Sequence, residues 1–248
     1  MNSDKEYGAQ ESVWALVPVK SLSWAKRRLN CFLGDDCAEL TKAMFKDVIG
    51  GLNSSSKVGD MAVVTADLDI IALAEAMGVF VIKETRSFGM NISLHNGIDV
   101  LRDLGAEWVG IFPVDIPLAT GAEIDRLISV VNQECCNLGR KVIGITPGGK
   151  REGTNFLYFN TAEPICLKYG SDSFSLHQAM AREIQITSVI VDSYALSVDL
   201  DKESDIDEFV SHAIQNPTFQ KTETWGFLER KGYIDRVQSM GRQHEQSC

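Results

Sequence analysis

Short apolar runs alternate with amphipathic segments along most of this chain, and this alternation restricts the fold more than any other feature. The expected strands are residues 13–19, 61–65, 79–83, 108–112, 142–145 and 155–159. The expected helices are residues 35–52, 67–77, 91–104, 121–134 and 203–213, with a further helix starting near 174. The pattern predicts an α/β fold with a mainly parallel central sheet and helices on both faces. Such sheets bind ligands at the carboxyl ends of their strands.

Composition sets the limits on domain organisation and partners. The chain has 248 residues, 44% of them hydrophobic, and no linker-like stretch divides it. We expect a flexible N-terminus at 1–12, one domain at 13–213 and a partly helical C-terminal extension at 214–248. The net charge of -10 disfavours binding to nucleic acid or to an anionic membrane. No apolar run approaches the ~20 residues of a membrane span, so a cytoplasmic location is expected.

A cluster of cations follows the first expected strand. Lys20, Lys26, Arg27 and Arg28 come directly after residues 13–19. In an α/β protein, the loop after the first strand is a common phosphate site. This loop is poor in glycine, so side-chain cations would have to hold the phosphates. The alternative is a solvated basic loop.

Asp115 is the first candidate metal ligand. It follows the strand at 108–112 and stands between Pro113 and Pro117, which hold the backbone in a stiff, extended turn. A carboxylate fixed in this way suits a metal ion. The alternative, a cap for the helix at 121–134, is disfavoured because Asp115 lies too early in the chain.

A second acidic stretch, Asp199 and Asp201, alternates with apolar residues. We expect a short strand here that projects both carboxylates from one face, where either could meet Asp115. Two carboxylates are a usual way to hold Mg²⁺, with phosphate oxygens and water completing the shell. Asp201 has a second interpretation, as the start of the helix at 203–213.

Small hydroxyl residues beside glycines form a third candidate site, at residues 151–155 and 169–177. Thr154, Gly170 and Ser173 could let polar groups approach an anionic ligand closely. Ser173 could also cap the helix starting near 174, whose N-terminus favours an anion. Taken alone, glycine with serine most often indicates only a turn. The cysteines and histidines show no zinc-ligand spacing, and no GxGxxG motif is present.

Six motifs in order resemble those of one family, the 2-phospho-L-lactate guanylyltransferases of the CofC/FbiD type. They are VPVKSLSWAKRRL, GMNISLHNGI, FPVDIPL, EGTNFLYF, YGSDSFSLH and LSVDLDKESDI, which span roughly residues 13–210. The resemblance implies a Rossmann-like nucleotide-diphospho-sugar transferase (GT-A-like) fold, similar to that of the molybdenum-cofactor guanylyltransferases. It also implies a role in the biosynthesis of coenzyme F(420).

The resemblance further implies residue roles. Lys20, Lys26 and Arg28 would meet the phosphates of GTP, and Lys20 and Lys26 would stabilise the leaving pyrophosphate. Asn91 would hold the nucleoside.

The remaining roles concern the metal and the acceptor. Asp115 and Asp199 match the metal-binding aspartates of the family, and Asp115 is counted among the catalytic residues. Thr154, Gly170 and Ser173 match positions that bind the phosphorylated acid.

The implied reaction transfers GMP from GTP, with Mg²⁺, to the phosphate of a small acid and releases pyrophosphate. The family uses 2-phospho-L-lactate, phosphoenolpyruvate and 3-phospho-D-glycerate, and the sequence does not choose among them. The product is expected to pass to the next enzyme of the pathway, and a homodimer is left open. Two alternatives remain. One is a nucleotidyltransferase acting on a sugar phosphate or molybdopterin, and the other is a non-catalytic nucleotide-sensing module on the same fold.

Overall fold

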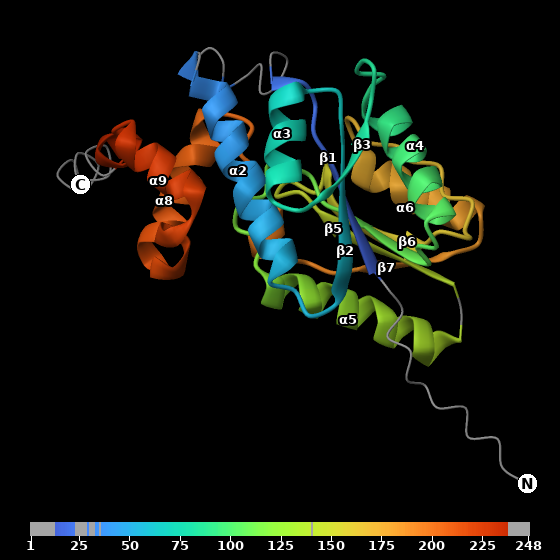
Figure 1. The fold of residues 1–248 in the computed structure, drawn as a ribbon. Coiled ribbons are helices and arrows are strands. Elements are labelled where there is room, and N and C mark those ends of the chain that lie inside the picture. Colours follow the sequence, from blue (N-terminus) through green and yellow to red (C-terminus); the bar gives the residue numbers. More distant parts are fainter. Residues whose placement is uncertain (1–12, 23–28, 30–32, 35, 140, 238–248) are drawn as a thin grey trace, which may run out of the picture.

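A seven-stranded sheet forms the centre of the protein in a computed structural model (Figure 1). The structure describes residues 13–22, 29, 33–34, 36–139 and 141–237. The strand order is β3-β2-β1-β4-β6-β5-β7. The strands are β1 (Val13–Pro18), β2 (Val58–Thr65), β3 (Phe80–Lys83), β4 (Trp108–Ile111), β5 (Val142–Pro147), β6 (Thr154–Asn160) and β7 (Thr187–Ile190).

Parallel pairing dominates this sheet. All neighbouring strands pair in parallel except at β6, which is antiparallel to both β4 and β5. The prediction of a mainly parallel sheet is therefore confirmed. β7 was not expected from the sequence, because its four residues are only partly buried and carry too short a pattern to be recognised.

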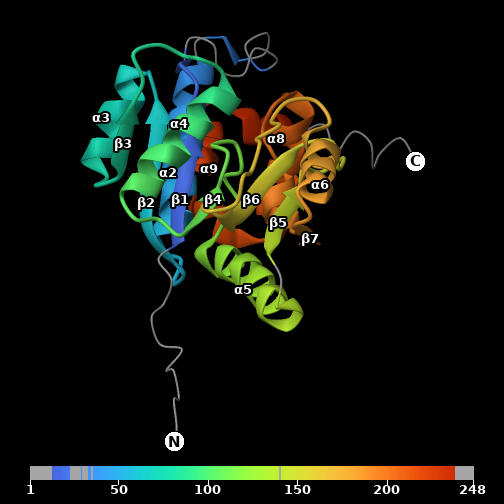
Figure 2. The ribbon, with the colours of Figure 1, turned by 90° about the vertical axis from the view of Figure 1, so that its right-hand side faces the viewer.

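Helices cover both faces of the sheet (Figure 2). Apolar side chains of α2, α3 and α5 pack on one face, and those of α4 and α6 pack on the other. The helices whose bounds lie within the described residues are α2 (Asp36–Asn53), α3 (Leu68–Ala76), α4 (Met90–Asp103), α5 (Gly121–Leu138), α6 (Ser173–Glu183), α7 (Tyr194–Ser197), α8 (Glu203–Gln215) and α9 (Glu223–Arg230), with a 3-10 helix η2 (Pro217–Lys221). None of the helices in the described ranges is long and apolar enough to cross a lipid bilayer.

The C-terminal helices form a further layer against the outer side of α2 (Figure 1). Leu40 and Met44 of α2 pack with Phe209 of α8 and Trp225 of α9 in a third apolar cluster. The carboxylate of Asp47 accepts hydrogen bonds from the first backbone N–H groups of α9, at 2.7 and 2.8 Å. Helix α2 is therefore buried between the sheet and the C-terminal segment.

The expected strand around Asp199 and Asp201 is wrong. Residues Tyr194–Ser197 form a single helical turn, because the hydroxyl of Ser193 accepts a hydrogen bond from the backbone N–H of Leu196 at 3.2 Å. The following residues pair with a loop and not with a strand: the N–H of Leu200 donates to the carbonyl oxygen of Asp115 at 2.9 Å. The two acidic segments nevertheless lie side by side.

Candidate active site

A cavity of about 120 Å³ opens at the carboxyl end of β1. Strand β1 lies between β2 and β4, so chain connections leave it in both directions and the sheet has its topological switch point there. The cavity is lined by Pro18, Val19, Lys20, Thr41, Met90, Pro113, Val114, Asp115 and Asp201. The fold thus brings together a lysine and a carboxylate that the sequence predicts for the site, together with Asp201.

Lys20 is held at the cavity by its neighbours in the chain. The N–H of Val19 donates to the carbonyl oxygen of Val64 at 3.0 Å, which extends the pairing of β1 with β2. The carboxylate of Asp67 accepts from the N–H of Leu22 at 2.8 Å and fixes the backbone two residues after Lys20. The Lys20 side chain is exposed and, within the described part of the chain, has no hydrogen bond or ion pair. Its charge is therefore available for an anionic ligand.

Two of the predicted phosphate-binding residues, Lys26 and Arg28, lie outside the described residues, as does Arg27. Their predicted roles remain predictions.

The aspartates divide between two environments. Asp201 lines the cavity with Asp115, whereas Oδ1 of Asp199 lies 3.4 Å from Nδ2 of Asn155. The same Asn155 amide donates to the carbonyl oxygen of Leu196 at 2.7 Å. Among the described residues, no group of three or more His, Cys, Asp or Glu side chains could hold a metal ion. Any metal here would depend on a pair of carboxylates with oxygen ligands from phosphate and water.

Thr154 begins β6 and contacts a buried histidine. Its Oγ1 lies 3.0 Å from Nδ1 of His177, and the backbone N–H of Lys168 donates to Nε2 of the same ring at 3.0 Å. Because Nε2 is an acceptor, we infer that Nδ1 carries the proton and donates to Thr154. The hydroxyl proton of Thr154 then remains available for a ligand. Burial, and secondarily the positive charge of Lys168, lowers the pKa of His177 to about 4.

This depressed pKa predicts a pH-dependent stability. The pKa of His177 is about 4 in the folded protein against an ordinary value of 6.5, so the unfolded chain binds the proton more readily. The resulting stabilisation is present above about pH 6.5 and is lost as the pH falls toward 4. Between about pH 7.5 and pH 5 the loss is on the order of 2 kcal/mol.

Urea unfolding of the wild type and His177→Gln across this pH range measures the effect. The variant should be less stable at neutral pH, and its free energy of unfolding should fall less steeply on acidification. Equal slopes for both proteins would contradict the buried, neutral histidine.

Gly170 and Ser173 lie next to this pair. Gly170 has a φ of 140°, which L side chains rarely adopt, and Ser173 is the buried first residue of α6. The N–H of Ser173 donates to the carbonyl oxygen of Gly170 at 3.3 Å, and the N–H of Phe174 donates to that of Glu152 at 3.1 Å. The second bond joins the two predicted acceptor-binding segments. Both bonds occupy helix N–H groups, so the hydroxyl groups of Thr154 and Ser173 are the more available donors.

Asn91 connects the start of α4 to the acceptor-binding segment. Its Nδ2 donates to the carbonyl oxygen of Tyr169 at 3.0 Å, and its Oδ1 accepts from the N–H of Tyr169 at 2.8 Å. Both polar ends of this side chain are therefore engaged with the backbone beside Gly170.

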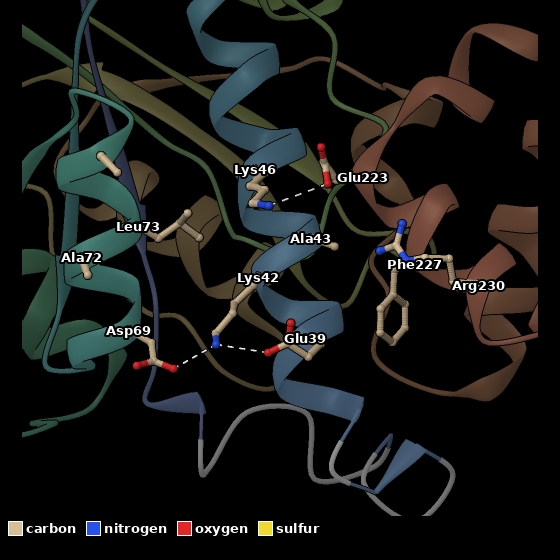
Figure 3. A pocket seen from close by; sticks show the side chains of 11 residues that line it. Glu39, Lys42, Ala43, Lys46, Asp69, Ala72, Leu73, Glu223, Phe227 and Arg230 are labelled. Atoms are coloured by element: carbon tan, nitrogen blue, oxygen red, sulfur yellow. Dashed lines mark hydrogen bonds and ion pairs between the residues drawn. The ribbon is translucent and has the colours of Figure 1, made fainter.

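A larger cavity, about 510 Å³, lies between α2, α3 and α9 (Figure 3). Its lysines already face carboxylates: Lys42 lies 3.2 Å from Glu39 and 2.9 Å from Asp69, and Lys46 lies 3.7 Å from Glu223. Size alone would favour this cavity. The smaller one is the better candidate because it lies at the switch point and combines two carboxylates with a lysine that has no ion pair among the described residues.

Comparison with known proteins identifies the family. Residues 13–230 match a family described as guanylyl transferase, CofC like. The chain belongs to this family. It is therefore a nucleotidyltransferase, and the family implies GTP as its co-substrate. The prediction of a CofC-type guanylyltransferase is confirmed.

Curated relatives cover most of the chain. The phosphoenolpyruvate guanylyltransferase of Sphaerobacter thermophilus is 29% identical over 200 residues, which is 80% of this chain and 93% of that protein. The 2-phospho-L-lactate guanylyltransferase of Methanothermobacter thermautotrophicus is 31% identical over 199 residues, which is 80% of this chain and 84% of that protein.

Solved structures confirm the nucleotide-diphospho-sugar transferase type of fold. A protein from Desulfovibrio desulfuricans G20, described as a nucleotide-diphospho-sugar transferase, superposes with a TM-score of 0.71 at 16% identity and covers 90% of this chain and 96% of its own. A cytidylyltransferase from Leptospira borgpetersenii gives a TM-score of 0.56 at 11% identity, with 90% and 96% covered.

Proposed function

We propose that this protein transfers GMP from GTP to the phosphate of a small phosphorylated three-carbon acid, with release of pyrophosphate, in coenzyme F(420) biosynthesis. The observation that carries the proposal is the cavity at the switch point, because Lys20, Asp115 and Asp201 all line it. Relatives named for phosphoenolpyruvate and for 2-phospho-L-lactate support this acceptor class. 3-Phospho-D-glycerate carries the same two anionic groups and belongs to the proposed class.

The carboxylates would hold Mg²⁺. Asp115 and Asp201 line one cavity and offer the hard oxygen ligands that Mg²⁺ prefers, and Asp199 lies two residues before Asp201. A bound Mg²⁺ would neutralise phosphate charge at the reacting phosphorus. Whether the second ligand is Asp201 or Asp199, Asp115 is the first.

The cations would act on the phosphates of GTP. Lys20 would contact the β- and γ-phosphates, and Lys26 and Arg28 would add charge from the same loop. Because negative charge accumulates on the departing pyrophosphate, a fixed cation there favours the transition state over the ground state.

The acceptor would bind on the far side of β1, beyond β4. Thr154 and Ser173 would donate hydroxyl hydrogen bonds to its carboxylate or phosphate, and Gly170 would let the backbone approach closely. The His177 ring fixes the Thr154 hydroxyl, and Asn91 fixes the backbone before Gly170. We assign positioning roles to these two residues.

The transfer requires no protein nucleophile or general base. The second pKa of a phosphate monoester is about 6, so the acceptor phosphate is mostly dianionic at neutral pH. One of its oxygens attacks the α-phosphorus of GTP in line, a new P–O bond forms, and the bond to the bridging oxygen of pyrophosphate breaks. The protein has to reduce charge repulsion and fix the geometry.

Pyrophosphate release tests the proposal directly. GTP, ATP and CTP are each combined with phosphoenolpyruvate, 2-phospho-L-lactate and 3-phospho-D-glycerate in the presence of Mg²⁺. We expect release with GTP and at least one of the three acids. A sugar phosphate and molybdopterin serve as comparison acceptors, and release with either of them but with none of the three acids would overturn the proposed acceptor class.

A further inference from the structure

Glu84 has a buried carboxylate oxygen with no hydrogen-bond partner in the described part of the chain. It follows β3, and its N–H donates to the carbonyl oxygen of Thr65 at 2.9 Å, which fixes its backbone beside β2. Its Oε2 accepts a hydrogen bond from the hydroxyl of Ser93 at 2.7 Å. Its Oε1 is buried and has no hydrogen-bond partner among the described residues. A buried acceptor without a donor is costly, so a ligand or water is expected there.

This oxygen borders a small cavity that adjoins the active site. The cavity, about 20 Å³, is lined by Pro18, Val19, Lys20, Ser21, Val64, Ala66, Glu84, Ser87, Gly89, Met90 and Ser93. It shares Pro18, Val19, Lys20 and Met90 with the cavity that contains Asp115. Its volume admits one water, or the polar edge of a ring whose remainder lies outside between Lys20 and the exposed residues 85–89.

The position of Lys20 decides which part of the nucleotide lies nearest Glu84. Asp115 follows β4, and Thr154 begins β6, so the metal and acceptor sites lie on one side of β1. Glu84 follows β3, on the opposite side, beyond β2. A nucleotide whose phosphates contact Lys20 and face the acceptor therefore directs its base toward Glu84. Asn91 is less suited to bind the base edge, because both polar ends of its amide bond the backbone of Tyr169.

We propose that Glu84 selects guanine by accepting, at Oε1, a hydrogen bond from the 2-amino group of the base, while Oε2 keeps its bond from Ser93. An ionised carboxylate only accepts hydrogen bonds, and guanine presents two adjacent donors on this edge. Adenine presents an acceptor at N1 and no 2-amino group, so it would leave Oε1 unpaired. Sites that bind a ligand through a buried polar group discriminate strongly against analogues that lack the matching group. This inference rests on the proposed function, since it concerns the GTP of the same reaction.

Glu84→Gln tests the inference through a change of preference. Xanthine has a carbonyl oxygen where guanine has the 2-amino group, and the glutamine amide can donate to it. We expect kcat/KM with GTP to fall about 10- to 100-fold and kcat/KM with xanthosine triphosphate to rise about 10-fold or more. The KM for the acid should not change. Glu183→Gln, which alters an exposed carboxylate of α6, is the matched control and should leave both nucleotides unaffected.

Two outcomes would overturn the inference. One is unchanged kcat/KM with GTP, and the other is an equal loss with GTP and xanthosine triphosphate, as expected if Oε1 only holds a structural water. Calorimetric Kd values for the two nucleotides separate this inference from the proposed function. Suppose that no acid accepts GMP, but that Glu84→Gln still weakens the binding of GTP and strengthens the binding of xanthosine triphosphate. The proposed function then fails and the selection of guanine stands.

Discussion

Asp115→Asn is expected to lower kcat/KM for guanylyl transfer by about 1,000-fold, equivalent to about 4 kcal/mol of transition-state stabilisation. The amide keeps the size of the side chain but removes its negative charge, so it is a poor ligand for a divalent cation. Residual activity should need a higher Mg²⁺ concentration than the wild type. Steady-state pyrophosphate release, measured over a range of Mg²⁺ concentrations, gives both quantities.

The matched control is Asp60→Asn. Asp60 is exposed in β2, toward the end of the strand opposite the active site. The substitution removes one carboxylate from the same acidic protein at a position away from the cavity. The kcat/KM of this variant should equal that of the wild type. If both variants lose activity equally, or if Asp115→Asn keeps full activity at low Mg²⁺, the metal-binding role of Asp115 is wrong.

The fold could be predicted well where the chain repeats a simple pattern. The buried run from Val13 to Pro18 and the helix Asp36–Asn53 were both expected from apolar spacing, since periodicity reports which face of an element is buried. The apolar pattern gave a wrong prediction where a local hydrogen bond determines the backbone conformation. The Ser193 cap turns residues 194–197 into a helix, although the alternation around Asp199 resembles a strand.

The active site could be predicted only from residues whose local sequence constrains them. Asp115 stands out because two prolines flank it, and Lys20 because it ends an apolar strand. His177 and Glu84 gave no such signal, because each acquires its role from tertiary contacts. The Glu84 carboxylate depends on Ser93, and the His177 ring depends on Thr154 and Lys168. Neither pairing has a sequence motif of its own.

Gly51→Ala should cause a large loss of stability, because helix α2 passes very close to the loop that carries Asp115. A Cβ at Gly51 would overlap the carbonyl oxygen of Ala119 and lie 3.1 Å from its carbonyl carbon. Both are backbone atoms, so the clash is relieved only if the helix or the loop moves. We expect a decrease of about 2 to 3 kcal/mol in the free energy of unfolding. Because residues 112–120 connect β4 to α5 and include Asp115, kcat/KM should also fall.

Gly50→Ala provides a matched control one residue away in the same helix. A Cβ at Gly50 meets no atom within 4 Å, and the position is exposed. Alanine there should stabilise the protein by about 0.5 kcal/mol, since it favours the helix more than glycine does. Urea unfolding and pyrophosphate release on both variants therefore compare the same substitution with opposite expected signs. A stabilising effect of both would mean that α2 and the loop at Ala119 are not in close contact. A loss of stability in Gly51→Ala with full activity would mean that the loop moves at Ala119 without displacing Asp115.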